Sequence, residues 1–133
     1  MDFYYSVLTR LIEKGQYFKF QYVDFENKEK MDLIDEEGLN SDPNFQQYVF
    51  SSEEYFQDFT ALTNELKKPV LVIAGEYDNA VGPNHHQLFQ FRNAEVSLLK
   101  SGHHPYIENQ LEFKDAVLHF VDNQFRLRRI SDK

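Results

Sequence analysis

A carboxylate and an imidazole each stand just beyond a stretch of sequence that is typical of a buried strand. Asp78 ends the tetrapeptide GEYD at 75–78, and His103 comes 25 residues later, directly after Ser101 and Gly102. A neutral imidazole can take a proton from a hydroxyl group, while a carboxylate on its other nitrogen fixes the tautomer and stabilises the imidazolium that forms. If the two side chains meet in the fold, they are equipped for general base chemistry on a hydroxyl nucleophile.

Two predicted strands must bring these side chains together. Residues 70–74 are a continuous apolar run rich in β-branched side chains, which is typical of a parallel strand covered on both faces. Residues 94–99 predict a second strand. Active sites of open parallel sheets lie beyond the carboxyl ends of the strands. We therefore expect Asp78 and His103 to lie on neighbouring loops at one end of the strand pair.

The segments around the second strand predict helices. Pro83 stands where a crossover helix would begin, and Leu88 and Phe91 would give that helix an apolar side. Apolar residues recur at helical spacing over about 108–125, which predicts a final helix. The order strand, helix, strand, helix indicates an α/β protein with a parallel pair and a right-handed crossover.

The chain divides near residues 67–69, where its composition changes. Residues 1–66 are aromatic and charged with no series of strands, and we expect them to form a cap-like segment and a linker helix. Residues 67–133 carry the strand and helix pattern of the α/β part. Aromatic residues reach 16% of the whole chain, with 13 Phe and 8 Tyr, so large rings are available for packing or for an apolar pocket.

Local signals predict two helices in the cap-like segment. One spans about 4–14 and ends before Gly15. A second spans about 51–66, with Ser51 as its N-cap and a glutamate at the capping-box position. Residues 18–22 alternate in polarity, so both strand and helix remain open there.

Residues 69–78 (PVLVIAGEYD) and 102–108 (GHHPYIE) together resemble the end of the α/β-hydrolase family. In that family the last two sheet strands are followed by an acid loop and by a Gly-His-x-Pro-x-x-Glu histidine loop. The resemblance implies that Asp78 is the acid and His103 the base of a Ser-His-Asp triad. It covers roughly residues 52–125. It implies a partial α/β-hydrolase fold, with the last two parallel strands, flanking helices and a helical cap remnant that is most similar to proline iminopeptidases.

The nucleophile of such a triad is missing from the sequence. No Gly-x-Ser-x-Gly elbow occurs, and none of the seven serines has glycines on both sides. The oxyanion loop and the earlier strands of the family would precede Met1. We therefore expect the C-terminal portion of a serine hydrolase that cleaves acyl or peptide bonds, present as a truncation, a split-gene half or a fragment and inactive alone.

The predicted sheet also leaves the first strand with an unpaired edge. Such edges template pairing with other chains, and two strands give little independent stability. We expect self-association or dependence on a complementing N-terminal half, unless the aromatic residues of 18–22 fold back over the edge. The competing class is a non-catalytic interaction fragment, in which the triad-like residues are relics and the exposed edge binds a partner.

Several residues have alternative interpretations. Asp78 lies in good turn chemistry, and His104 is a rival base if the loop register shifts by one residue. The histidine pairs at 85–86 and 103–104 offer the nitrogen ligands of a zinc site. Two features argue against such a site: no carboxylate has a familiar ligand spacing to them, and neighbouring histidines on a helix diverge. Glu108 is expected to serve the N-terminus of the final helix electrostatically.

Composition narrows the function classes further. A net charge of −8 argues against nucleic acid and anionic membrane as partners. The absence of cysteine excludes disulfides, thiolate zinc sites and a cysteine nucleophile. The longest apolar run is too short for a membrane span, and the start lacks the pattern of a signal peptide. We expect a cytoplasmic protein without cofactor or metal, whose complete enzyme takes a small acyl or peptide substrate.

Overall fold

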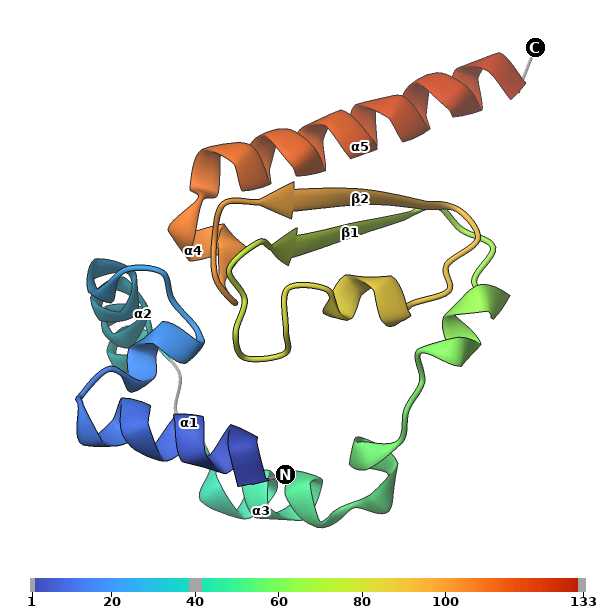
Figure 1. The fold of residues 1–133 in the computed structure, drawn as a ribbon. Helices are drawn as coiled ribbons and strands as arrows, with labels where there is room; N and C mark the ends of the chain where they lie inside the picture. Colours follow the sequence, from blue (N-terminus) through green and yellow to red (C-terminus); the bar gives the residue numbers. More distant parts are fainter. Residues whose placement is uncertain (1, 39–41, 132–133) are drawn as a thin grey trace.

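Two parallel strands lie between helical segments in the computed structural model, which describes residues 2–38 and 42–131 (Figure 1). β1 (Val70–Gly75) pairs with β2 (Ala94–Leu99), and Val70 lies opposite Ala94. The long C-terminal helix and the connection from β1 to β2 lie on opposite sides of this pair (Figure 1). Both predicted strands and their parallel pairing are confirmed, so the described part is a small mixed α/β structure.

Helical elements make up most of the remaining structure. The α-helices are α1 (Asp2–Glu13), α2 (Phe25–Gly38), α3 (Pro43–Ser51), α4 (Pro105–Glu108) and α5 (Gln110–Ser131). The 3-10 helices are η1 (Tyr17–Phe20), η2 (Glu53–Phe56), η3 (Ala61–Glu65) and η4 (His85–Leu88). The helix predicted over 4–14 is confirmed as α1, and the final helix is confirmed as α5, preceded by the short α4.

Gly15 ends α1 by the mechanism that its residue type suggests. Its φ is +62°, in the left-handed region where glycine has no steric penalty. This conformation turns the chain back, so that the N–H of Gln16 donates to the carbonyl of Leu11 at 2.7 Å. The next segment forms the 3-10 helix η1, which decides the question left open at 18–22 against a strand.

The helix predicted over 51–66 is wrong. Ser51 ends α3 instead of starting a helix, because Asp42 caps an earlier start and accepts the N–H groups of Asn44 and Phe45. Only the short η2 and η3 follow. Between them the Asp58 carboxylate accepts the hydroxyl and the N–H of Thr60, which fixes a turn and lowers the pKa of Asp58 below its ordinary value.

The crossover helix predicted from Pro83 is also wrong. The structure has only the four-residue η4, and the Asn84 side chain makes no capping hydrogen bond to it. Gly82 has a φ of +97°, and Phe89 is already extended at the other end. The ring of Phe89 stacks on that of Phe91, with centroids 5.6 Å apart. Aromatic packing of an extended segment therefore replaces the expected helix.

The strand pair is less covered than its sequence predicts. All of β1 except Gly75 is half-buried, and in β2 Val96 and Leu98 are 49% and 48% exposed. Among the described residues, the buried large apolar side chains are Tyr22, Leu99 and Ile107. One helix and one loop cannot shield both faces of a strand pair, so the apolar pattern of β1 and β2 exceeds the cover that these elements provide.

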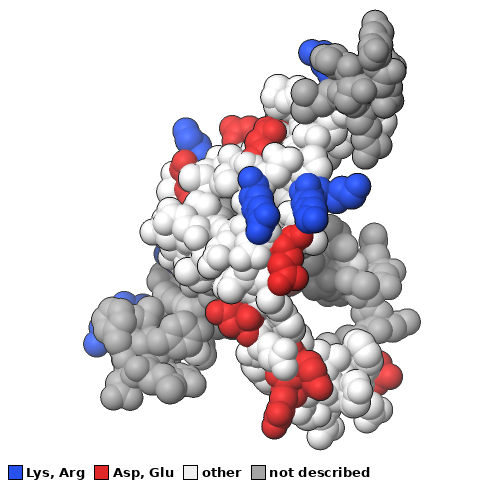
Figure 2. Space-filling view, turned by 90° about the vertical axis from the view of Figure 1, so that its right-hand side faces the viewer, with Lys and Arg blue, Asp and Glu red and all other residues white. Residues whose placement is uncertain are grey.

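Charge is distributed unevenly over the surface. Figure 2 shows acidic side chains on both the upper and the lower part of one face, and a group of basic side chains near its centre with an acidic group directly below. Within residues 2–38 and 42–131, no helix combines the length and the apolar character that a membrane crossing needs.

Candidate functional site

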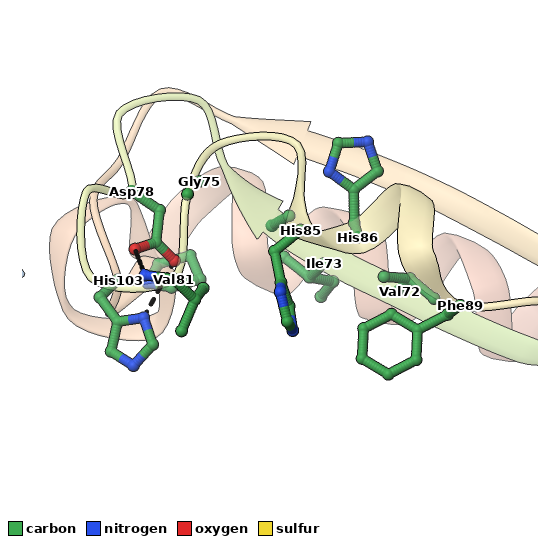
Figure 3. A pocket seen from close by; sticks show the side chains of 12 residues that line it. Val72, Ile73, Gly75, Asp78, Val81, His85, His86, Phe89 and His103 are labelled. Carbon is green, nitrogen blue, oxygen red and sulfur yellow. Dashed lines mark hydrogen bonds and ion pairs between the residues drawn. The ribbon is translucent and has the colours of Figure 1, made fainter. Parts of the chain in front are cut away.

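Asp78 and His103 meet at the carboxyl end of the strand pair (Figure 3). The Nδ1 atom of His103 lies 2.9 Å from Oδ2 of Asp78. The residue Asp78 is only 8% exposed, whereas the His103 side chain is 34% exposed. The expected neighbouring positions of the two loops are thus confirmed. One imidazole edge faces the carboxylate while part of the ring stays open to solvent.

The second oxygen of Asp78 is held by its own loop. Oδ1 accepts the N–H of Ala80 at 2.9 Å and that of Val81 at 3.2 Å. These two bonds form the local turn that the sequence suggests, and they leave Oδ2 directed at His103. When a neutral imidazole faces an ionised carboxylate, which can only accept hydrogen bonds, Nδ1 carries the proton and Nε2 is left as the acceptor.

Backbone contacts lock the acid loop against the histidine loop. The N–H of Glu76 donates to the carbonyl of Leu99 at 2.9 Å, and that of Tyr77 to the carbonyl of Ser101 at 3.0 Å. A Cβ atom on Gly75 would lie 2.0 Å from the carbonyl oxygen of Gly102. Only glycine fits at position 75, so this residue permits the close approach that places Asp78 beside His103.

The cap-like segment also contacts the site. The carbonyl of Gln21 accepts the N–H of His103 at 2.6 Å, and a Cβ atom on Gly102 would lie 2.4 Å from the same oxygen. The side-chain amide of Asn79 also donates to the carbonyl of Lys19 at 3.3 Å. Sequence reasoning missed this role of Gln21, and no side-chain signal marks it, because the contact uses a backbone carbonyl that every residue has.

His104 has a different environment from His103. Its ring stacks on Tyr22 with centroids 4.7 Å apart, and its Nδ1 lies 3.1 Å from the hydroxyl of Tyr106. The carboxylate of Asp78 pairs with His103. The geometry therefore favours His103 over His104 as the base.

A cavity of about 190 Å³ adjoins the Asp78–His103 pair. Its lining includes four successive residues of β1, Val72 to Gly75, and no residue of β2. The cavity therefore lies against β1 and not against β2. It is smaller than the roughly 300–1,000 Å³ of usual small-molecule sites.

The histidines of η4 line the same cavity but do not form a metal site. His85 and His86 point to opposite sides of the η4 turn, which confirms that these neighbours diverge (Figure 3). The Nδ1 atom of His86 is buried without a hydrogen-bond partner in the structure. In the part of the chain that the structure describes, no group of three or more His, Cys, Asp or Glu residues is placed to hold a metal ion.

Comparison with protein-family models, with curated proteins and with solved structures gives no significant match. What the site can do chemically is therefore inferred from its own geometry and from the sequence motifs around it.

Proposed function

We propose that this chain is the C-terminal portion of a serine α/β-hydrolase and supplies the acid and the base of its triad. The observation that carries the proposal is the 2.9 Å contact between His103 and Asp78 at the carboxyl ends of adjacent parallel strands. The order Asp then His along the chain is the one that the triad has in α/β-hydrolases. The reaction class is hydrolysis of an acyl or peptide bond.

Each residue has one role in this proposal. The Nδ1–H of His103 donates a hydrogen bond to the carboxylate of Asp78, which stays ionised, and Nε2 takes the proton from a serine hydroxyl that attacks the acyl carbon. The imidazolium then gives this proton to the leaving group, while the carboxylate of Asp78 stabilises its charge. A water molecule repeats the sequence to release the acyl group. The serine and the oxyanion-hole donors belong to residues outside this sequence, and the mechanism requires no cofactor.

The position of the cap-like segment supports a small peptide or acyl substrate, as in enzymes similar to proline iminopeptidases. Gln21 contacts the histidine loop directly, so residues of the first half of the chain border the reacting groups. The cavity beside the pair is too small to enclose a substrate by itself. Completion of the pocket by the nucleophile-bearing part explains this size.

The free edge of β1 is where we place that part. The backbone N–H of Val70 points toward β2 and donates to the carbonyl of Asn93. Because backbone hydrogen-bonding groups alternate in direction along a strand, the N–H and C=O groups of Leu71 and Ile73 point away from β2. The adjoining cavity is lined by β1 and by no residue of β2. A strand added here would extend the sheet and cover side chains that are half-exposed in this chain.

We expect the isolated chain to self-associate at micromolar concentration. Leu71→Pro removes one outward N–H, whereas Val72→Pro removes an N–H directed at β2. Leu71→Pro should lower the apparent mass in light scattering and leave the circular dichroism unchanged, while Val72→Pro should unfold the strand pair. A compact wild-type monomer that unfolds cooperatively would show that the edge is satisfied internally.

The test of the proposed function uses a fluorophosphonate probe, which labels activated serines. The isolated chain should remain unlabelled and should not hydrolyse esters above buffer, since it has neither elbow nor oxyanion hole. Co-expression with the segment encoded directly upstream of Met1, if that segment carries Gly-x-Ser-x-Gly, should give labelling at its serine. Labelling of the isolated chain, or a co-expressed pair that associates without activity, would contradict the proposal.

The second candidate is a non-catalytic interaction fragment, which the same free edge of β1 favours. In that case a bound partner would depend on the edge and not on the triad-like pair. Binding would then be lost with Leu71→Pro and kept with His103→Ala, and no hydrolysis would accompany it. The serine-hydrolase proposal expects instead that His103→Ala keeps association and loses turnover.

A further inference from the structure

Glu108, the last residue of α4, makes a set of contacts that the triad chemistry does not use. Its Oε1 atom accepts the N–H of Gly102 at 2.9 Å and that of His104 at 3.3 Å. Its Oε2 atom accepts the N–H of Val23 at 2.7 Å. The sequence suggested an electrostatic role at the N-terminus of the final helix. The structure corrects this, because the carboxylate accepts hydrogen bonds from backbone amides of the histidine loop and from that of Val23.

The three amides around the histidine are thereby all engaged. Glu108 holds those of Gly102 and His104, and the Gln21 carbonyl holds that of His103 between them. Glu108 also binds Val23, two residues after Gln21. A single carboxylate thus ties the histidine loop to residues 21–23, which contact that loop. With both neighbouring amides held, the backbone of His103 cannot rotate without breaking a charge-assisted hydrogen bond.

We propose that Glu108 is the positioning residue of His103, because it holds the histidine loop in the one conformation in which Nδ1 faces Asp78. It touches neither the reacting atoms nor the imidazole. The consequence for catalysis rests on the proposed hydrolase function, whereas the effect on the His103–Asp78 contact does not. The inference can therefore be tested on the isolated chain.

We call the three hydrogen bonds of Glu108 the clamp, and two substitutions separate the bonds of its Oε1 atom from the bond of its Oε2 atom. In Glu108→Gln the remaining carbonyl oxygen can still accept from Gly102 and His104, but the amide NH₂ then meets the N–H of Val23. In Glu108→Leu all three bonds are lost at similar volume. The matched control is Glu112→Gln, four residues further on. The carboxylate of Glu112 accepts a hydrogen bond from the side chain of Asn109.

The readout is the imidazole Nδ1 proton of His103 in ¹⁵N-labelled protein, which a bond to Asp78 protects from exchange with water. We expect Glu108→Leu to raise its exchange rate on the order of tenfold to a hundredfold, as for loss of hydrogen bonds to a charged group. Glu108→Gln should have a smaller effect, and Glu112→Gln should match the wild type. Asp78→Ala should abolish the protected signal and so assigns it.

An unchanged signal in Glu108→Leu, with the β1–β2 amide resonances intact, would overturn the positioning role. The hydrolase proposal would survive that result, since the triad pair would be formed without the clamp. If Glu108→Leu fails to fold, Glu108→Gln decides, because equal exchange in Glu108→Gln and wild type would also contradict the inference. A protected His103 signal in a co-expressed pair that has no activity would sink the hydrolase proposal and leave the role of Glu108 standing.

Discussion

In the proposed enzyme, formed by co-expression of this chain with the nucleophile-bearing segment, replacing His103 by alanine should lower kcat by on the order of 10⁴- to 10⁶-fold. In the proposed mechanism the imidazole, which contacts Asp78, takes the serine proton and returns it to the leaving group. Asp78→Asn should also cost on the order of 10⁴-fold, because an amide at this position favours the wrong tautomer of His103. Ester hydrolysis under single-turnover and steady-state conditions would measure both losses of activity.

His104→Ala is the matched control for this prediction. Its ring stacks on Tyr22 and lies beside the hydroxyl of Tyr106, so its loss removes packing and leaves the proton path intact. We expect a change in kcat of less than about tenfold, in keeping with a residue that does not touch the reacting atoms. If His104→Ala were inactive and His103→Ala active, the base would have to be His104 and the loop would have to be in another register.

Replacing Gly75 by alanine should separate the two loops of the site. The new Cβ would overlap the carbonyl oxygens of Gly102 and Ser101 at 2.0 and 2.5 Å, and these are backbone atoms that no side-chain rotation can move. Overpacking costs about 1–3 kcal/mol and occasionally more, and we expect the upper part of this range or beyond. Urea unfolding of the isolated chain measures the loss of stability, and the His103 Nδ1 proton reports the loss of the contact with Asp78.

Gly15→Ala distinguishes this steric effect from the general cost of replacing glycine. Position 15 has a left-handed φ of +62° and no atom within 4 Å of an added Cβ. A left-handed residue with a Cβ costs about 1–2 kcal/mol, so Gly15→Ala should lower stability and leave the His103 signal unchanged. The close approach of the loops would be refuted if Gly75→Ala kept a wild-type His103 signal.

The predictability of each element followed from where its stabilising contacts lie. The strands at 70–75 and 94–99 were predictable because apolar runs bounded by proline, glycine and polar residues carry their own signal. The helix over 51–66 and the crossover helix were not. In the first, Asp42 caps an earlier helix that ends at Ser51, and Asp58 binds the Thr60 backbone. In the crossover, Gly82 has a left-handed φ before the four-residue η4, and Phe89 is extended after it.

The clamp by Glu108 shows a second kind of miss. Its position six residues after Gly102 was part of the motif that led to the histidine loop, so the residue was visible in the sequence. Its partners were not, since Val23 lies 85 residues away and contributes only a backbone N–H. Long-range bonds to main-chain groups leave no trace in residue types, because every residue but proline offers the same donor.

By itself the sequence determined that a carboxylate and an imidazole follow two strands predicted to be parallel neighbours, and that no serine elbow accompanies them. Those features depend on residue types and on spacing along the chain. Only the tertiary structure decided that Asp78 faces His103 and not His104, and that one edge of β1 lacks a partner within the described residues. Both outcomes depend on how segments distant in sequence approach each other. Gly75, Gln21 and Glu108 set that approach through contacts with the backbone.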